Sequence, residues 1–172
     1  MITTLDLKKI YQWAKDTRFP TKSVPTADGY SNKNVNYCWL KAEGKSKDGS
    51  KPVKYLNKKI VKNPDVVEIL NNQDIIFVTF SSFDSWTILN PHRDPDIYRE
   101  RYKRIQLPIN IPHPNHCFMI WDNKKVTWKE GVAQTYPVMD VTHEGYNLST
   151  KSMEFVMIDV KLDAEVENET NS

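Results

Sequence analysis

The apolar residues at alternate positions between residues 104 and 111 constrain the fold of this chain most. They stand at every odd position from Ile105 to Ile111. Successive side chains of a β-strand point to opposite faces, so the pattern predicts a strand that buries its odd positions. Arg104 and Gln106 would then project from the other face into a cavity, where a buried charge needs a partner.

Other short segments between residues 75 and 160 also have strand character, with turn signals between them. The expected strands are 75–80, 86–89, 104–111, 117–121, 126–128, 132–136 and 153–160. Residues 122–125 give a hairpin signal. Many short strands with regular turns are typical of a β sandwich or barrel, so we expect two facing antiparallel sheets.

The first 74 residues favour helices and loops. A helix is expected over residues 5–15 with Thr4 as its N-cap, and a second over residues 63–71, where Asn63 precedes a proline. The apolar stripe of the first helix consists of Leu7, Ile10, Tyr11 and Ala14. Residues 41–62 contain eight lysines and are predicted to form a solvated loop, with some strand near residues 53–56.

Composition indicates one α+β domain that is mainly β. We expect the domain to span residues 1–162, with a helical and loop part over 1–74, a core over 75–160 and an acidic disordered tail over 163–172. The net charge of +2 and the absence of a long apolar run give no case for nucleic acid or a membrane. Two distant cysteines and no visible signal peptide predict free thiols and a cytoplasmic location.

The motif His92-Arg93-Asp94 and the distant His143 form an H-x-D…H pattern. Two imidazoles and one carboxylate can occupy one face of an octahedral iron(II) ion and leave three positions free. Side chains at i and i+2 of an extended segment point the same way, so His92 and Asp94 can reach one metal. His113 and His116, with Cys117, form a rival group that a proline-rich loop explains better.

Residues 80–160 resemble the aspartyl/asparaginyl β-hydroxylase family of Fe(II)/2-oxoglutarate-dependent oxygenases. The matching segments, in order, are Phe80-Ser81, Pro91-His92-Arg93-Asp94, Arg104-Ile105-Gln106-Leu107-Pro108-Ile109, Trp128-Lys129-Glu130-Gly131, His143-Glu144 and Ile158-Asp159-Val160. Order and spacing agree over about half of the chain, which is more specific than the H-x-D motif alone. In residues 1–74 we recognise no resemblance.

The resemblance implies a double-stranded β-helix, or jelly roll, with the N-terminal helices packed outside it. It also implies Fe(II), 2-oxoglutarate as cosubstrate and O2, with His92, Asp94 and His143 as metal ligands and catalytic residues. Ser81 falls where the family has a serine that touches 2-oxoglutarate, and Arg104-Ile105-Gln106 falls where the family has Arg-x-His. The implied reaction hydroxylates a C–H of an amino acid or of an Asp or Asn residue in a polypeptide.

Met153 departs from the family pattern, which has an arginine there that clamps the far carboxylate of 2-oxoglutarate. Methionine offers no such fork of donors. We expect Arg104 to bind that carboxylate across the cavity from Met153, assisted by Ser81 and Gln106. Lesser substitutes are Arg101, Lys103 and Lys151. Two alternatives stay open: a non-catalytic jelly-roll binding module, and a metal enzyme that does not use 2-oxoglutarate.

Overall fold

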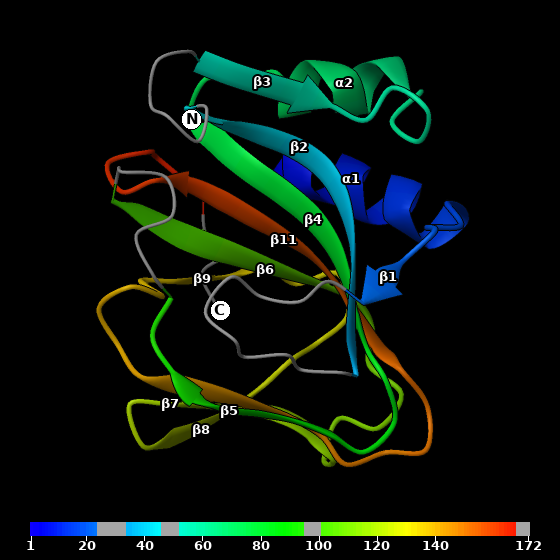
Figure 1. The fold of residues 1–172 in the computed structure, drawn as a ribbon, viewed down its shortest axis with the longest axis vertical. Helices are drawn as coiled ribbons and strands as arrows, with labels where there is room; N and C mark the ends of the chain where they lie inside the picture. The colour runs from blue at the N-terminus through cyan, green and yellow to red at the C-terminus, as the bar shows by residue number, and fades with distance from the viewer. Residues whose placement is uncertain (24–33, 46–51, 95–100, 168–172) are drawn as a thin grey trace.

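The computed structural model describes residues 1–23, 34–45, 52–94 and 101–167, and two antiparallel sheets form its two layers (Figure 1). The larger sheet has the order β1 (Lys22–Ser23), β2 (Val35–Lys45), β4 (Ile75–Phe83), β11 (Met153–Lys161), β6 (Tyr102–Asn110) and β9 (Gln134–Tyr136), and β3 (Pro52–Leu56) also pairs with β2. The smaller sheet has the order β5 (Thr87–His92), β10 (His143–Asn147), β7 (Cys117–Trp121) and β8 (Lys124–Thr127). The predicted double-stranded β-helix is confirmed.

The large sheet carries apolar side chains on both of its faces. Ile105, Leu107 and Ile109 of β6 lie in a core that includes buried residues of α1 (Thr4–Asp16) and α2 (Pro64–Leu70). The opposite face of the sheet contributes Phe155 to a second core that includes Met119 of the small sheet. The predicted burial of the odd positions of β6 is therefore correct, and its even positions point toward the space between the sheets.

The N-cap of the first helix lies one residue before the predicted cap, and the helix begins at Thr4. Thr3, not Thr4, is the N-cap: its hydroxyl accepts from the Asp6 N–H, and the Asp6 carboxylate accepts from the Thr3 N–H. This reciprocal capping box satisfies two backbone donors, which Thr4 as the cap would not achieve with Leu7 three residues later. Leu7 and Ile10 are buried as predicted, while Tyr11 is only partly buried.

The lysine-rich segment is a strand pair over much of its length, which corrects the expected loop. β2 extends to Lys45 and pairs with β3, and residues 46–51 lie outside the described ranges. Lys41 is buried, with Nζ 3.2 Å from Glu43 Oε1 and 3.1 Å from the Asn72 carbonyl oxygen. Because a carboxylate and a carbonyl satisfy its ammonium group, the strand tolerates a lysine at a buried position.

Two local predictions hold. α2 follows the Asn63 cap, whose side chain accepts from the backbone N–H groups of Asp65 and Val66. Asp122 and Asn123 have φ angles of 46° and 62° in the turn between β7 and β8. Positive φ at both central residues is typical of a two-residue hairpin turn.

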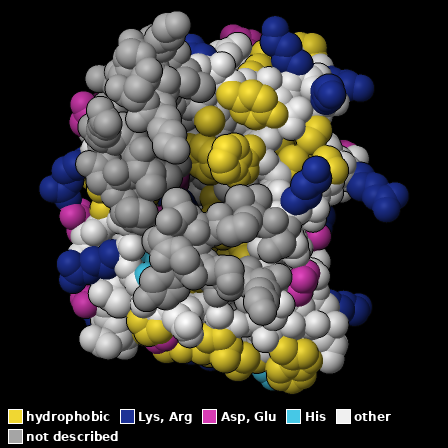
Figure 2. Space-filling view, in the orientation of Figure 1, with side chains coloured by type: hydrophobic (Ala, Val, Ile, Leu, Met, Phe, Trp, Pro, Cys, Tyr) yellow, Lys and Arg dark blue, Asp and Glu magenta, His cyan; other side chains and the backbone are white. Residues whose placement is uncertain are grey.

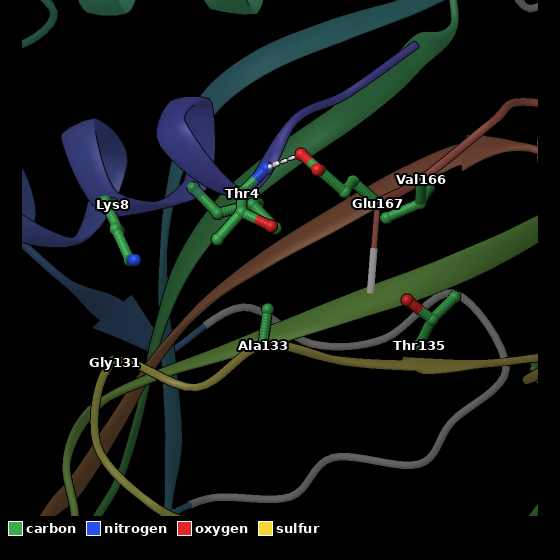
Figure 3. Close-up of a pocket in the computed structure, with 8 residues that line it drawn as sticks. Thr4, Lys8, Gly131, Ala133, Thr135, Val166 and Glu167 are labelled. Carbon is green, nitrogen blue, oxygen red and sulfur yellow. Dashed lines mark hydrogen bonds between the residues drawn. The ribbon is translucent and has the colours of Figure 1, made fainter. Parts of the chain in front are cut away.

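Residues 165–167 of the expected acidic tail pack against the N-terminus. Val166 forms a parallel bridge with Ile2, and the Thr4 N–H donates to Glu167 Oε2 at 2.8 Å. Figure 3 shows this bond at the edge of a small pocket between the start of α1 and the chain before β9. Residues 168–172 of the tail lie outside the described ranges. Among the described residues, no helix combines the length and apolar character needed to span a bilayer.

Candidate metal centre

The three residues of the H-x-D…H pattern meet at one end of the small sheet. One donor atom from each of His92, Asp94 and His143 lies within 4.8 Å of the others. His92 and His143 are direct partners in the antiparallel pairing of β5 with β10. Asp94 follows the end of β5, where its N–H donates to the Val138 carbonyl at 3.0 Å. Strand pairing thus aligns the two rings, and one backbone hydrogen bond fixes the carboxylate beside them.

Backbone carbonyls set the orientation of both imidazole rings. His92 Nδ1 lies 2.7 Å from the Asn90 oxygen, and His143 Nδ1 lies 3.1 Å from the Val141 oxygen. A carbonyl oxygen only accepts, so each Nδ1 carries the hydrogen and each neutral ring keeps its lone pair on Nε2. Both Nε2 atoms lie 3.4 Å from Asp94 Oδ1. Hydrogen-bonded rings of this kind are the usual state of metal-binding histidines.

Three electron-rich atoms that converge in this way repel one another unless a positive charge lies between them. A proton shared with Asp94 is one solution, and a divalent metal ion is another. Two neutral imidazoles and one carboxylate match the donor set that non-haem iron(II) uses. No other group of three such side chains occurs within the described ranges, so the rival set of His113, His116 and Cys117 is not assembled there.

Arg104 lies beside this cluster and links it to a second carboxylate. Its Nη1 is 2.6 Å from Asp94 Oδ2, while Nε and Nη2 bind the two oxygens of Asp159 at 2.6 and 2.9 Å. Burial alone would raise the pKa of Asp94, but the charge of Arg104 above all holds it well below its usual range. Asp94 is therefore an anion, as a metal ligand must be.

Asp159 was not assigned a role from the sequence. Its side chain is 1% exposed, and it stands opposite Arg104 in the pairing of β6 with β11. One signal was available, because a carboxylate within the apolar run 153–160 needs a buried partner. The expectation that Met153 lies across from Arg104 is wrong: six positions separate Met153 from Asp159 on β11, roughly 20 Å of extended strand.

The predicted cosubstrate residues lie on successive inward-facing positions of the large sheet. Arg104, Gln106 and Ser81 are level with Asp159, Met157 and Phe155 of β11, in that order. Gln106 accepts a hydrogen bond from the Trp128 indole at 3.1 Å. The buried Ser81 hydroxyl has no hydrogen-bond partner among the described residues. A buried hydroxyl without a partner is costly, so it favours a ligand oxygen at this place.

The lesser candidate cations are engaged elsewhere or exposed. Arg101 pairs with Asp140 on the surface, and Lys103 donates to the Ala164 carbonyl at 2.7 Å. Lys151 lies on an exposed turn after β10. Residues 95–100, which include part of the basic segment before Arg104, lie outside the described ranges. Of the described cations, Arg104 alone contacts a candidate ligand.

Tryptophans occupy different places around the site. Trp121 stacks on His143 with 5.2 Å between ring centres, and Trp128 is buried between the sheets. From the sequence, Trp86 could lie either in the core or in a substrate wall; it is 63% exposed, which rules out the core. Trp39 of β2, a residue the sequence did not single out, is half exposed and meets Phe77 edge to face at 5.7 Å. Figure 2 shows hydrophobic side chains gathered over this part of the large sheet, with lysines and arginines scattered at the periphery.

Comparison with known proteins agrees with this arrangement. The family model for aspartyl/asparaginyl beta-hydroxylase matches residues 6–162, so the similarity also includes most of the N-terminal part, where none was recognised from the sequence. An oxidoreductase of the 2OG-Fe(II) oxygenase family from Burkholderia pseudomallei superposes with a TM-score of 0.57 at 8% identity, covering 90% of this chain and 77% of that one. At that identity the likeness concerns the fold.

Other solved structures are more distant. The plu4264 protein from Photorhabdus luminescens has a TM-score of 0.47 at 8% identity, with 83% of this chain and 82% of that one covered. KdgF from a Halomonas species has a TM-score of 0.42 at 14% identity, with coverages of 76% and 83%. No curated protein sequence matches the chain.

Proposed function

Because the chain belongs to the aspartyl/asparaginyl β-hydroxylase family, we propose that it is an Fe(II)- and 2-oxoglutarate-dependent oxygenase. It would hydroxylate a C–H of an amino acid or of an Asp- or Asn-type residue in a polypeptide. The observation that carries this proposal is the convergence of the His92 and His143 Nε2 atoms on Asp94 Oδ1. A non-catalytic module would have no need to keep three ligands in this geometry.

The protein's own contribution is ligation, orientation and shielding. His92, Asp94 and His143 would hold iron(II) on one face, while the side-chain exposure of Asp94 and His143, 11% and 5%, limits access of water. Bound iron would supply the redox chemistry that joins O2 activation to decarboxylation of an oxo acid. The stacked Trp121 ring restricts movement of His143, which keeps its Nε2 directed at the metal.

The oxo acid would lie along the inner face of the large sheet. The unpaired Ser81 hydroxyl suits one of its carboxylate oxygens, and Gln106 lies between Ser81 and the metal end. The role of Arg104 as the carboxylate clamp stays a prediction, and it would require the guanidinium to exchange an existing partner. Loss of a charge-assisted bond worth about 1.5–3 kcal/mol would raise the 2-oxoglutarate KM roughly 10–100-fold.

The substrate would approach past an aromatic wall. Phe77 is level with Asp159 on the inner face, and Trp39 extends this wall to exposed positions on β2. Such a pair offers apolar and stacking contacts to a side chain presented to the metal. A Trp39→Ala variant should therefore raise the KM for the substrate and leave metal affinity unchanged.

The engagement of Arg104 with two carboxylates favours one competing function, a metal enzyme that uses no oxo acid. Succinate release from 2-oxoglutarate, measured with Fe(II) under air, separates the two, with His143→Ala as the inactive control. We expect iron-dependent succinate release that amino-acid or peptide substrates increase. If the iron-loaded wild type neither binds 2-oxoglutarate nor releases succinate, the competing function replaces our proposal.

A further inference from the structure

We propose that Asp159 is a positioning residue for the metal centre, acting through Arg104 to hold Asp94 as a ligand that offers one oxygen and its full charge. This inference rests on the proposed metal centre. Asp159 is linked to the site through the guanidinium of Arg104, which also binds Asp94.

The geometry of Arg104 assigns a separate task to each oxygen of Asp94. Nη1 of Arg104 donates to Oδ2 of Asp94 at 2.6 Å, while Oδ1 of Asp94 lies 3.4 Å from the Nε2 atoms of both histidines. The remaining donors, Nε and Nη2, bind Asp159 side by side. A guanidinium is planar and rigid, so fixing one edge on Asp159 fixes the direction of Nη1. Asp94 is thereby held with Oδ1 toward the metal position and Oδ2 turned away.

The charges support the same assignment. A guanidinium next to a metal site opposes binding of a divalent cation, because like charges repel at short range. Asp159 supplies a second carboxylate, so the group of Asp94, Arg104 and Asp159 keeps one net negative charge. Without Asp159 the net charge of the group would be zero, and Arg104 would compete with the metal for Asp94. A neutral residue at position 159 should therefore weaken metal binding, although position 159 acts on the metal only through Arg104 and Asp94.

The strand register makes this arrangement rigid. Arg104 and Asp159 are direct partners on β6 and β11, central strands of the large sheet. Their side chains are 17% and 1% exposed, so water cannot readily replace either partner. Partners of metal ligands commonly contribute 10–100-fold to metal affinity when they are fixed in this way.

The test is Co(II) affinity, measured by anaerobic titration against a competing chelator. Asp159→Asn should bind Co(II) roughly 10–100-fold more weakly than wild type. Asp140→Asn is the matched control, because it removes the carboxylate of another Arg–Asp pair that lies on the surface, and it should bind within about twofold of wild type. Equal affinity in Asp159→Asn and wild type would overturn the proposal.

A double variant separates positioning from a merely structural role. Asp159→Asn with Arg104→Gln restores the single negative charge of Asp94 and allows an amide pair, so it should regain part of the lost affinity. A double variant no better than Asp159→Asn would show that the role is structural only. If Asp159→Asn does not fold, Arg104→Lys replaces it: one ammonium cannot hold both carboxylates in register, so Co(II) affinity should fall about tenfold.

An unchanged Co(II) affinity in Arg104→Lys would also overturn the inference.

Failure of the proposed function is distinguishable from failure of this inference. Wild-type protein that binds no Co(II), or His92→Ala that binds it as well as wild type, contradicts the metal centre itself. A working metal centre that is insensitive to residue 159 contradicts the positioning role alone.

Discussion

Replacing Arg104 with methionine should destabilise the metal-free protein strongly, because it leaves Asp159 buried without its guanidinium partner. Asp159 is 1% exposed and receives two bonds from Arg104. Removing one partner of a buried ion pair costs about 3–5 kcal/mol. At 2–4 °C per kcal/mol for a chain of this size, the melting temperature should fall by roughly 6–20 °C. The control Arg101→Met breaks an exposed pair and should cost about 1 kcal/mol or less.

The stability difference between wild type and Arg104→Met should also depend on pH, which gives a second, independent test. In Arg104→Met, loss of the guanidinium favours protonation of the buried Asp159 carboxylate, which removes its charge. In the wild type, Asp94 has a lowered pKa, so its contribution to stability is present at neutral pH and is lost in acid. Both effects shrink the stability difference as pH falls. Urea denaturation at several pH values measures the difference in free energy of unfolding between wild type and Arg104→Met. A difference under about 1 kcal/mol at neutral pH, or a difference that grows in acid, would refute the reasoning.

Three further predictions concern single residues. Ser81→Ala removes the unpaired hydroxyl and should raise the 2-oxoglutarate KM about 2–12-fold, from a hydrogen bond worth about 0.5–1.5 kcal/mol, without changing Co(II) affinity; an unchanged KM would argue against a ligand there. Gly131→Ala should lower the free energy of unfolding by about 1–2 kcal/mol in urea denaturation, because Gly131 has a φ of +76° and an added Cβ would lie 3.4 Å from the Tyr11 ring. Burial lowers the pKa of His92, but hydrogen bonds to Asp94 and to the Asn90 carbonyl raise it by more, so the net pKa lies above the ordinary value of 6.5. As pH falls, protonation of His92 should therefore begin to weaken Co(II) binding at a pH above 6.5. If Co(II) affinity instead stays constant until well below pH 6.5, the prediction is wrong.

Local patterns predicted the parts of the site that depend on one strand at a time. The alternation in β6 directed Arg104 and Gln106 inward, because a period of two is a property of the strand itself. The spacing of His92 and Asp94 placed both on one side for the same reason. The H-x-D…H pattern and the family resemblance singled out His143, and the structure places it directly opposite His92.

Features that depend on strand register escaped prediction. The partner of Arg104 lies 55 residues away, and only the pairing of β6 with β11 brings Asp159 opposite it rather than Met153. The lysine-rich composition of residues 41–62 likewise hid the end of β2 and its pairing with β3, because the partners of the buried Lys41 could not be known from the sequence. Strand register decides which charged side chains become partners, and register joins residues far apart in the sequence. The composition of one segment therefore does not reveal these partners.

Anaerobic Fe(II) titration of wild type, His92→Ala and His143→Ala tests the central claim most directly. The convergence of the three ligands predicts one iron per wild-type chain and a large loss of binding in both variants. Wild-type stoichiometry and affinity in both variants would contradict the metal centre and the function built on it.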